Sequence, residues 1–290
     1  MKPSRTRWRG MRLSWLGVVP FALFLLVFLI FPLLLLVARA FEGGDGSPSL
    51  ENIHHLVAPD TLKAYRTSLL LSLVTALLGG ALGTLLAFAA IARGTPHWVR
   101  NQLTTLSAVT ANFAGVPLAF AFIATLGTNG LVTVLLRNAF GVTPADAGFS
   151  LYSFWGLCLV YLYFQVPLMV LVVGPSLDSL RHEWQEAATS LGATSAAYWR
   201  QVALPVIRPS VLGGTVLLFG NAFGAHSAAY ALTSGQFSLV PLLIGQTQTG
   251  DVVADANFGD TLALGMIVVL AVTLALYAGL MRTTAKWRRP

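Results

Sequence analysis

The sequence predicts an all-α membrane protein, a polytopic bundle of six transmembrane helices with both chain ends in the cytoplasm. Three observations lead to this prediction: the composition, the apolar runs and the placement of basic residues. Apolar residues make up 56% of the 290 residues and charged residues 10%, whereas a soluble domain carries roughly 25% charged residues. Such a chain cannot cover the surface of a soluble fold. A single cysteine, Cys158, excludes an intrachain disulfide.

Uncharged apolar runs define the expected membrane helices. A bilayer core about 30 Å thick requires about 20 apolar residues at a rise of 1.5 Å each. Six runs of that kind are predicted to span the membrane, at residues 13–38, 69–91, 103–126, 151–173, 211–232 and 262–281. The expected organisation is a basic tail at 1–12, one transmembrane domain at 13–281 and a basic tail at 282–290.

The basic residues predict the orientation of these spans, because an excess of Lys and Arg stays on the cytoplasmic side. With the N-terminus inside, 14 of the 18 basic residues fall on the inner face, with only Arg39, Lys63, Arg66 and Arg137 outside. Three of the 11 acidic residues are inside, so the inner face carries +11 and the outer face −4. The net charge of +7 therefore reflects membrane topology, and it does not indicate nucleic-acid binding.

The N-terminal run has a second interpretation. A basic start, an apolar run and Ala38-Arg39-Ala40 also resemble a cleavable signal peptide. The apolar stretch is longer than the 7 to 15 residues of a signal core, which favours a retained helix.

Catalytic and energy-coupling groups are missing from the predicted spans. The spans contain no Asp, Glu, Lys or Arg, and His226 is the only histidine in them. An ion-coupled transporter would keep such groups at membrane depth. No phosphate-binding G-x-x-x-x-G-K-[ST] loop is present, and the adjacent pair His54-His55 has no third metal ligand nearby. A membrane enzyme using His226 and a channel remain as alternatives.

The long inner connection between the fourth and fifth spans, residues 174–210, contains an amphipathic helix. Ser179 is suited to cap its N-terminus, and Gly192 to end it in a left-handed conformation. Its apolar stripe consists of Trp184, Ala187, Ala188 and Leu191. A second turn is expected to begin near Thr194 or Ser195 and to stop at Pro205, which lacks an amide proton. The stripe meets the membrane, its own bundle or a cytosolic partner, and periodicity alone does not choose among them.

The spacing in this connection resembles the EAA signature of ABC-importer permeases, E-A-A-x₃-G-x₉-I-x-L-P. Glu186-Ala187-Ala188, Gly192 and Val202-Ala203-Leu204-Pro205 reproduce it, with Val202 in place of Ile as the sole departure. The resemblance favours the docking interpretation. It implies a type I importer transmembrane domain in a bacterial cytoplasmic membrane, without cofactors, in which residues 175–209 form a coupling loop.

The same resemblance implies partners and roles. The expected partners are a second permease subunit, two cytosolic ATP-binding subunits that hydrolyse ATP, and an extracytoplasmic solute-binding protein. Glu186, Ala187 and Ala188 would dock on the ATPase, Gly192 would permit a sharp turn, and Leu204-Pro205 would set the angle into the fifth span.

Solute contacts are expected from polar side chains within the spans, and the candidates are Asn112, Gln165, Asn221 and His226. Each could equally satisfy a neighbouring backbone group. The outer segment at 240–259 resembles the spermidine/putrescine-type branch, whose relatives also handle iron, thiamine or phosphonates. The charge of −4 on the outer face would suit a cationic solute, although topology alone produces much of that bias.

Overall fold

The computed structural model describes residues 10–43, 46–91, 96–235, 237–249 and 257–286, and within them regular structure is helical apart from one isolated bridge between Glu42 and Pro48. The predicted tails lie largely outside the described residues. The helices are α1 (Gly10–Leu25), α2 (Phe31–Ala40), α3 (Glu51–His55), α4 (Pro59–Ile91), α5 (His97–Asn112), α6 (Val116–Leu126), α7 (Leu131–Phe140), α8 (Phe154–Asp178), α9 (His182–Ser190), α10 (Ser195–Tyr198), α11 (Leu204–Phe223), α12 (Ser227–Thr233), α13 (Val240–Thr249) and α14 (Phe258–Lys286), with π-helical turns η1 (Leu26–Ile30) and η2 (Trp199–Ala203).

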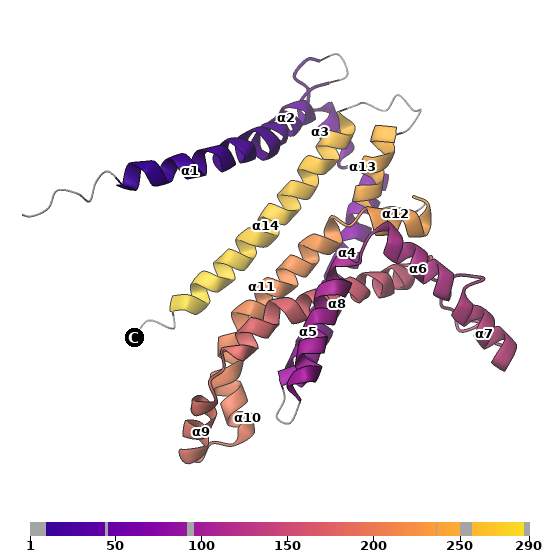
Figure 1. Cartoon of the computed structure of the whole chain (residues 1–290). Helices are drawn as coiled ribbons and strands as arrows, with labels where there is room; N and C mark the ends of the chain where they lie inside the picture. Colours follow the sequence, from indigo (N-terminus) through magenta and orange to yellow (C-terminus); the bar gives the residue numbers. More distant parts are fainter. Residues whose placement is uncertain (1–9, 44–45, 92–95, 236, 250–256, 287–290) are drawn as a thin grey trace, which may run out of the picture.

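Helices α4, α8 and α11 form the centre of the bundle, and α5 packs along α8 (Figure 1). Two apolar clusters fill this centre. One surrounds Tyr161 and Phe164 towards the N-terminal half of α8, and the other surrounds Met169 and Val173 towards its C-terminal half. Helix α8 is therefore the spine against which the other helices pack.

Glycines allow the central helices to approach closely. A methyl group on Gly83 of α4 would lie 2.5 Å from Cβ of Met169, and one on Gly214 of α11 would lie 2.6 Å from the Met169 sulfur. The side chain of Met169 is thus held between two glycines on opposite neighbours. Small residues have this role in membrane helices, where close packing replaces the hydrophobic effect between helices.

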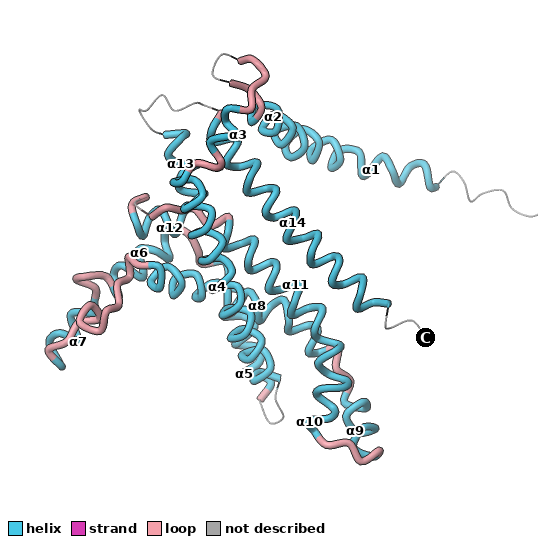
Figure 2. Tube along the Cα trace, turned by 180° about the vertical axis from the view of Figure 1, so that it is seen from behind, coloured by secondary structure: helices cyan, strands magenta, loops and turns pink. Residues whose placement is uncertain are grey.

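The N-terminal helices lead away from the bundle (Figures 1 and 2). Of the N-terminal elements, α2 makes the main contact with the body, against α14. The π turn η1 precedes Pro32, and η2 likewise precedes Pro205. A proline has no amide proton and its ring clashes with the carbonyl four residues earlier. A wider turn before each proline accommodates both effects.

Six helical segments of the described residues are long and apolar enough to cross a membrane, which is the predicted number: Val18–Ala40, Pro59–Ala90, Val116–Phe140, Phe154–Asp178, Ser195–Phe223 and Phe258–Gly279. The third and the fifth differ most from the expected bounds of 103–126 and 211–232. The second and sixth begin earlier than expected, and the fourth ends later. Two expected spans are not continuous helices, and the prediction is wrong there.

The expected span at 103–126 is broken between α5 and α6. Gly115 has a φ of +75°, and Pro117 follows at the start of α6. The left-handed Gly115 interrupts the helix, and Pro117 then lies in the first turn of α6, where a missing amide proton costs nothing. The expected span at 211–232 is broken between α11 and α12, where Gly224 ends α11.

Candidate coupling and translocation sites

The predicted docking helix is present as α9, with a corrected start. Ser179 does not cap it. Ser179 ends α8 instead, and its hydroxyl donates to the carbonyl of Ser176 at 2.7 Å. Residue Arg181, in an extended conformation, precedes α9 without a side-chain cap. The helix α8 continues to Asp178, so Ser179 lies at the end of α8 and not at the expected start of α9.

The end of α9 confirms the prediction for Gly192. Its φ is +78°, a left-handed conformation that favours glycine. The Ala193 amide donates to the carbonyl of Ala188, and the Gly192 amide to that of Thr189, each at 2.9 Å. These two bonds form a Schellman motif, which ends the helix and turns the chain towards α10.

The apolar stripe of α9 is not covered by the bundle. Leu191 is 88% exposed and Trp184 39% exposed. Glu186 and Ala187 are also exposed, and Ala188 is half-buried. Figures 1 and 2 place α9 and α10 together at one extremity of the molecule. The structure therefore presents the Glu-Ala-Ala face outward.

The segment after α9 differs from the prediction at Pro205. Thr194 does cap α10, accepting the Ala197 amide at 3.3 Å. The helix does not stop at Pro205, because η2 inserts a wide turn and α11 continues beyond it. Leu204 marks this turn by donating its amide to the carbonyl of Trp199, five residues earlier.

The root of the loop is packed, in contrast to its tip. Tyr198 and Ala203 are buried. The ring of Trp199 meets Phe88 of α4 edge to face, with centroids 4.7 Å apart. The segment that follows α10 is therefore packed against α4.

An ion pair near this end was not foreseen. Arg100 at the start of α5 pairs with Asp178 at the end of α8. Both residues were assigned to the inner face, but they are 78 residues apart, so no sequence pattern links them. The pair fixes the beginning of α5 beside the exit of α8.

The two helix breaks lie against each other. A methyl group on Gly115 would lie 2.9 Å from the Ser227 hydroxyl, and α6 packs on α12. The Tyr161 hydroxyl donates to the carbonyl of Ala225 at 2.9 Å, which satisfies one group freed by the second break. Irregular backbone at membrane depth is tolerated where it is buried in protein or lines a cavity.

The four predicted solute contacts do not converge. Gln165 is fully buried and donates to the Thr75 hydroxyl at 3.2 Å between α8 and α4. Asn112 is exposed and donates to the carbonyl of Ala108 on its own helix. His226 stacks on Tyr230, and its buried Nε2 has no hydrogen-bond partner among the described residues.

Asn221 lines a cavity of about 560 Å³ between α8, α11 and α14. The walls are mostly apolar, and Thr273 and Tyr277 add hydroxyl groups that the sequence analysis did not select. The predicted residues thus divide into one packing residue, Gln165, and three near the helix breaks or this cavity.

Similar proteins were found both by sequence and by structure. No model of a known protein family matches the chain. It is 29% identical over 174 residues to the sulfate transport system permease protein CysT of Salmonella typhimurium, covering 59% of this chain and 58% of that one. It is 28% identical over 242 residues to the chloroplastic sulfate permease 2 of Chlamydomonas reinhardtii, covering 83% of this chain and 57% of that one. The chain thus spans less than two thirds of the length of these two relatives.

A solved structure shares the fold over almost the whole chain. It is a bacterial ABC transporter involved in the import of the acidic polysaccharide alginate, with a TM-score of 0.72, 17% identity, and coverage of 97% of this chain and 99% of that one. The chain therefore shares the fold of the transmembrane part of an ABC importer. Among such proteins, the two sequence relatives above are named for sulfate. They do not support the predicted spermidine/putrescine-type branch.

Proposed function

We propose that the chain is the permease subunit of an ABC importer for a small oxyanion of the sulfate class. The observation that carries this proposal is α9, an exposed helix with the Glu-Ala-Ala face of the EAA motif, standing on a packed root. Its partners are a second permease subunit, two ATP-binding subunits that receive α9, and an extracytoplasmic solute-binding protein. Glu186, Ala187 and Ala188 make the contact.

The orientation follows from charge. With α9 in the cytoplasm, the inner segments hold 14 of the 18 basic residues, in agreement with the positive-inside rule. Both termini are then cytoplasmic, in a bacterial cytoplasmic membrane. The break between α5 and α6 and the cavity beside Asn221 lie between the two faces, and Asn112, Asn221 and His226 are the pathway residues that we propose.

An anionic solute agrees with two features of the chain. The relatives are named for sulfate, and α6 begins at the break with its N-terminus free of acidic residues. A helix N-terminus carries partial positive charge and favours anions. The charge of −4 on the outer face does not contradict this, because the positive-inside rule alone depletes Lys and Arg there.

Charge reversal at Glu186 tests the coupling role. Glu186→Lys should abolish co-purification with the cognate ATPase and uptake in reconstituted vesicles. In the proposed complex Glu186 pairs with a basic residue of the ATPase in a buried interface, and breaking such a pair costs about 2 to 5 kcal/mol. Glu183→Lys is the matched control, since Glu183 is also exposed and lies on the same helix. Normal uptake in Glu186→Lys would refute the coupling assignment.

The solute is tested separately, with radiolabelled sulfate and the wild-type complex. Uptake that requires ATP and is competed by selenate supports the sulfate class. If the complex takes up a different solute and does not take up sulfate, the solute assignment is wrong and the subunit assignment is unaffected.

A further inference from the structure

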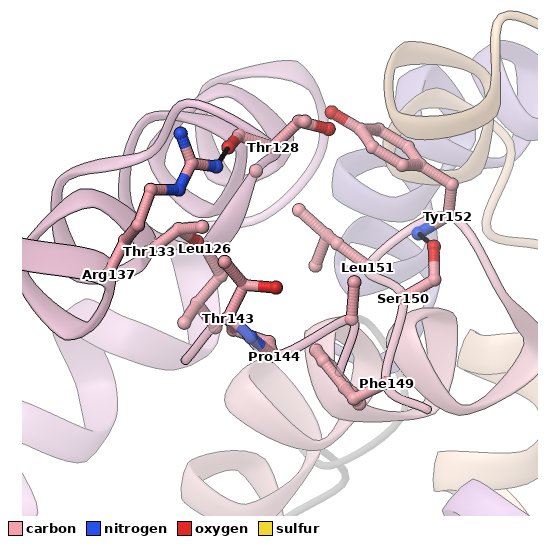
Figure 3. Close-up of a pocket in the computed structure, with 12 residues that line it drawn as sticks. Leu126, Thr128, Thr133, Arg137, Thr143, Pro144, Phe149, Ser150, Leu151 and Tyr152 are labelled. Atoms are coloured by element: carbon pink, nitrogen blue, oxygen red, sulfur yellow. Dashed lines mark hydrogen bonds between the residues drawn. The ribbon is translucent and has the colours of Figure 1, made fainter. Parts of the chain in front are cut away.

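A second cavity, distant from the coupling loop, is lined by hydrogen-bond donors. It has a volume of about 190 Å³ and lies between the end of α6, helix α7 and the segment 143–152 (Figure 3). None of its described lining residues is acidic. Its polar side chains are Thr128, Thr133, Arg137, Thr143, Ser150 and Tyr152.

Thr133 leaves a buried hydroxyl without a partner. The residue is 4% exposed, and its Oγ1 accepts from and donates to nothing among the described residues. Threonines elsewhere in the chain, such as Thr125 and Thr273, donate to the carbonyl four residues earlier. Thr133 lies in the first turn of α7, so the residue four positions earlier is outside the helix and offers no helical carbonyl to its hydroxyl. An unpaired buried hydroxyl is costly, so a ligand oxygen at this position would be favourable.

Arg137 supplies the positive charge of the cavity. Its guanidinium makes a long bond of 3.4 Å to the carbonyl of Thr128, visible in Figure 3, and it makes no ion pair among the described residues. A guanidinium has five donors, so most of them are available. The nearby carboxylate of Asp146 is already engaged, accepting the amide of Thr143 at 2.5 Å and its hydroxyl at 2.9 Å.

We propose that this cavity binds a tetrahedral oxyanion, with Arg137 providing the charge and the hydroxyl groups of Thr133, Thr128 and Tyr152 providing further hydrogen bonds. The lining residues include one cation and several hydroxyls and no carboxylate, although Asp146 nearby interacts with Arg137 electrostatically. Such a lining favours an anion. Figure 3 shows the Tyr152 hydroxyl pointing towards Thr128, whose carbonyl accepts from the Arg137 guanidinium on its other side.

The position of the cavity separates it from the coupling site. It lies before the N-terminal end of α8, whereas α9 follows the C-terminal end of this 25-residue helix, a separation of about 37 Å. In the proposed orientation it is on the extracytoplasmic side. The oxyanion has two possible sources, a free ion of the sulfate class or the phosphate of a lipid headgroup, because exposed Leu131 and Phe140 place apolar surface on the same helix. The choice of sulfate as a probe rests on the proposed function.

Binding is measured on the purified chain in nanodiscs of phosphatidylcholine, by scintillation proximity with radiolabelled sulfate at constant ionic strength. Arg137→Gln should weaken binding roughly tenfold or more, because it removes charge-assisted hydrogen bonds. Thr133→Val keeps the shape, removes the hydroxyl and should weaken binding roughly fivefold. Arg66→Gln is the matched control, an exposed arginine of the predicted outer face that does not line the cavity, and it should bind as wild type. Melting temperatures of all variants should match.

The outcomes separate the explanations. Saturable binding lost in Arg137→Gln and Thr133→Val supports the site. If nanodiscs of phosphatidylglycerol at the same ionic strength remove sulfate binding in wild type, the site stands and its occupant is the phosphate of an anionic headgroup, which zwitterionic phosphatidylcholine does not provide. Absence of saturable sulfate or phosphate binding, or an equal loss in Arg66→Gln, overturns the proposal. Because no ATPase or transport is involved, this result is independent of the Glu186 test.

Discussion

Gly83 provides the sharpest test of the close packing between α4 and α8. In Gly83→Ala the new methyl group would lie 2.5 Å from Cβ of Met169 and 2.7 Å from the carbonyl oxygen of Val166. Carbon atoms in contact are normally about 3.5 to 4.0 Å apart, so the helices must separate by about 1 Å. Overpacking of this kind costs typically about 1 to 3 kcal/mol, and the better helix propensity of alanine offsets up to about 1 kcal/mol of it.

The matched control is Gly279→Ala in α14, where nothing lies within 4 Å of the added methyl group. This variant should be neutral or stabilised by up to about 1 kcal/mol. The two variants should therefore differ by about 2 kcal/mol in the free energy of unfolding, or about 4 to 8 °C in melting temperature. The measurement is thermal unfolding in detergent followed by size-exclusion chromatography. Equal melting temperatures would refute the packing argument.

Three further predictions concern single groups. Tyr161→Phe should lower the free energy of unfolding by about 1 to 3 kcal/mol, because it leaves the Ala225 carbonyl unpaired; a melting temperature equal to wild type would contradict this role. Pro205→Ala should keep or raise stability while reducing uptake, since removing the proline lets η2 relax and rotates α9 by about 100° relative to α11; unchanged uptake would show that the wide turn does not set the position of α9. Hydrogen bonds from Thr143 lower the pKa of Asp146 below its ordinary value. The ionised carboxylate therefore stabilises the turn at 143–146 fully above the pKa of the unfolded chain, and this stabilisation is lost as the pH falls through the lowered pKa of the folded chain. The chemical shift of the Thr143 amide in NMR should follow this titration, and Asp146→Asn should abolish the pH dependence.

Hydropathy predicted the membrane class and the number of candidate spans, but it could not show where a span is broken. The residues on both sides of Gly115 and Gly224 are as apolar as those in a continuous helix. Lipid and buried protein select the same side chains, so a break that is covered by a neighbouring helix leaves no trace in composition. At the first break the pair Gly115 and Pro117 was a usable signal, and at the second the signal was a single glycine.

The coupling loop was predicted better, because its signals are local. Gly192 and Thr194 act through hydrogen bonds within a few residues, and both predictions are confirmed. The predictions that Ser179 caps a helix and that Pro205 ends one are wrong, because both depend on neighbouring residues. The helix α8 extends up to Ser179, and the wide turn η2 lets the helix continue through Pro205. The burial of Gln165 against Thr75 was not predictable for a similar reason, since it depends on the packing of α4, and its role in the pathway stays a prediction.

The continuity of the helix from α10 through η2 to α11 gives the proposed function a mechanical basis. The segment Ser195–Phe223 is 29 residues long and extends over about 43 Å. It begins beside the exposed α9, is fixed laterally by the contact of Trp199 with Phe88, and ends at the break beside Gly224. Under the proposed function, a movement imposed on α9 passes through the turn at residues 191–194 and then reaches that break through one helical element. The break also lies where α12 packs on α6, beside the break in the other interrupted span. Under the proposed function, a movement of α11 would therefore act at the junction of the two interrupted spans.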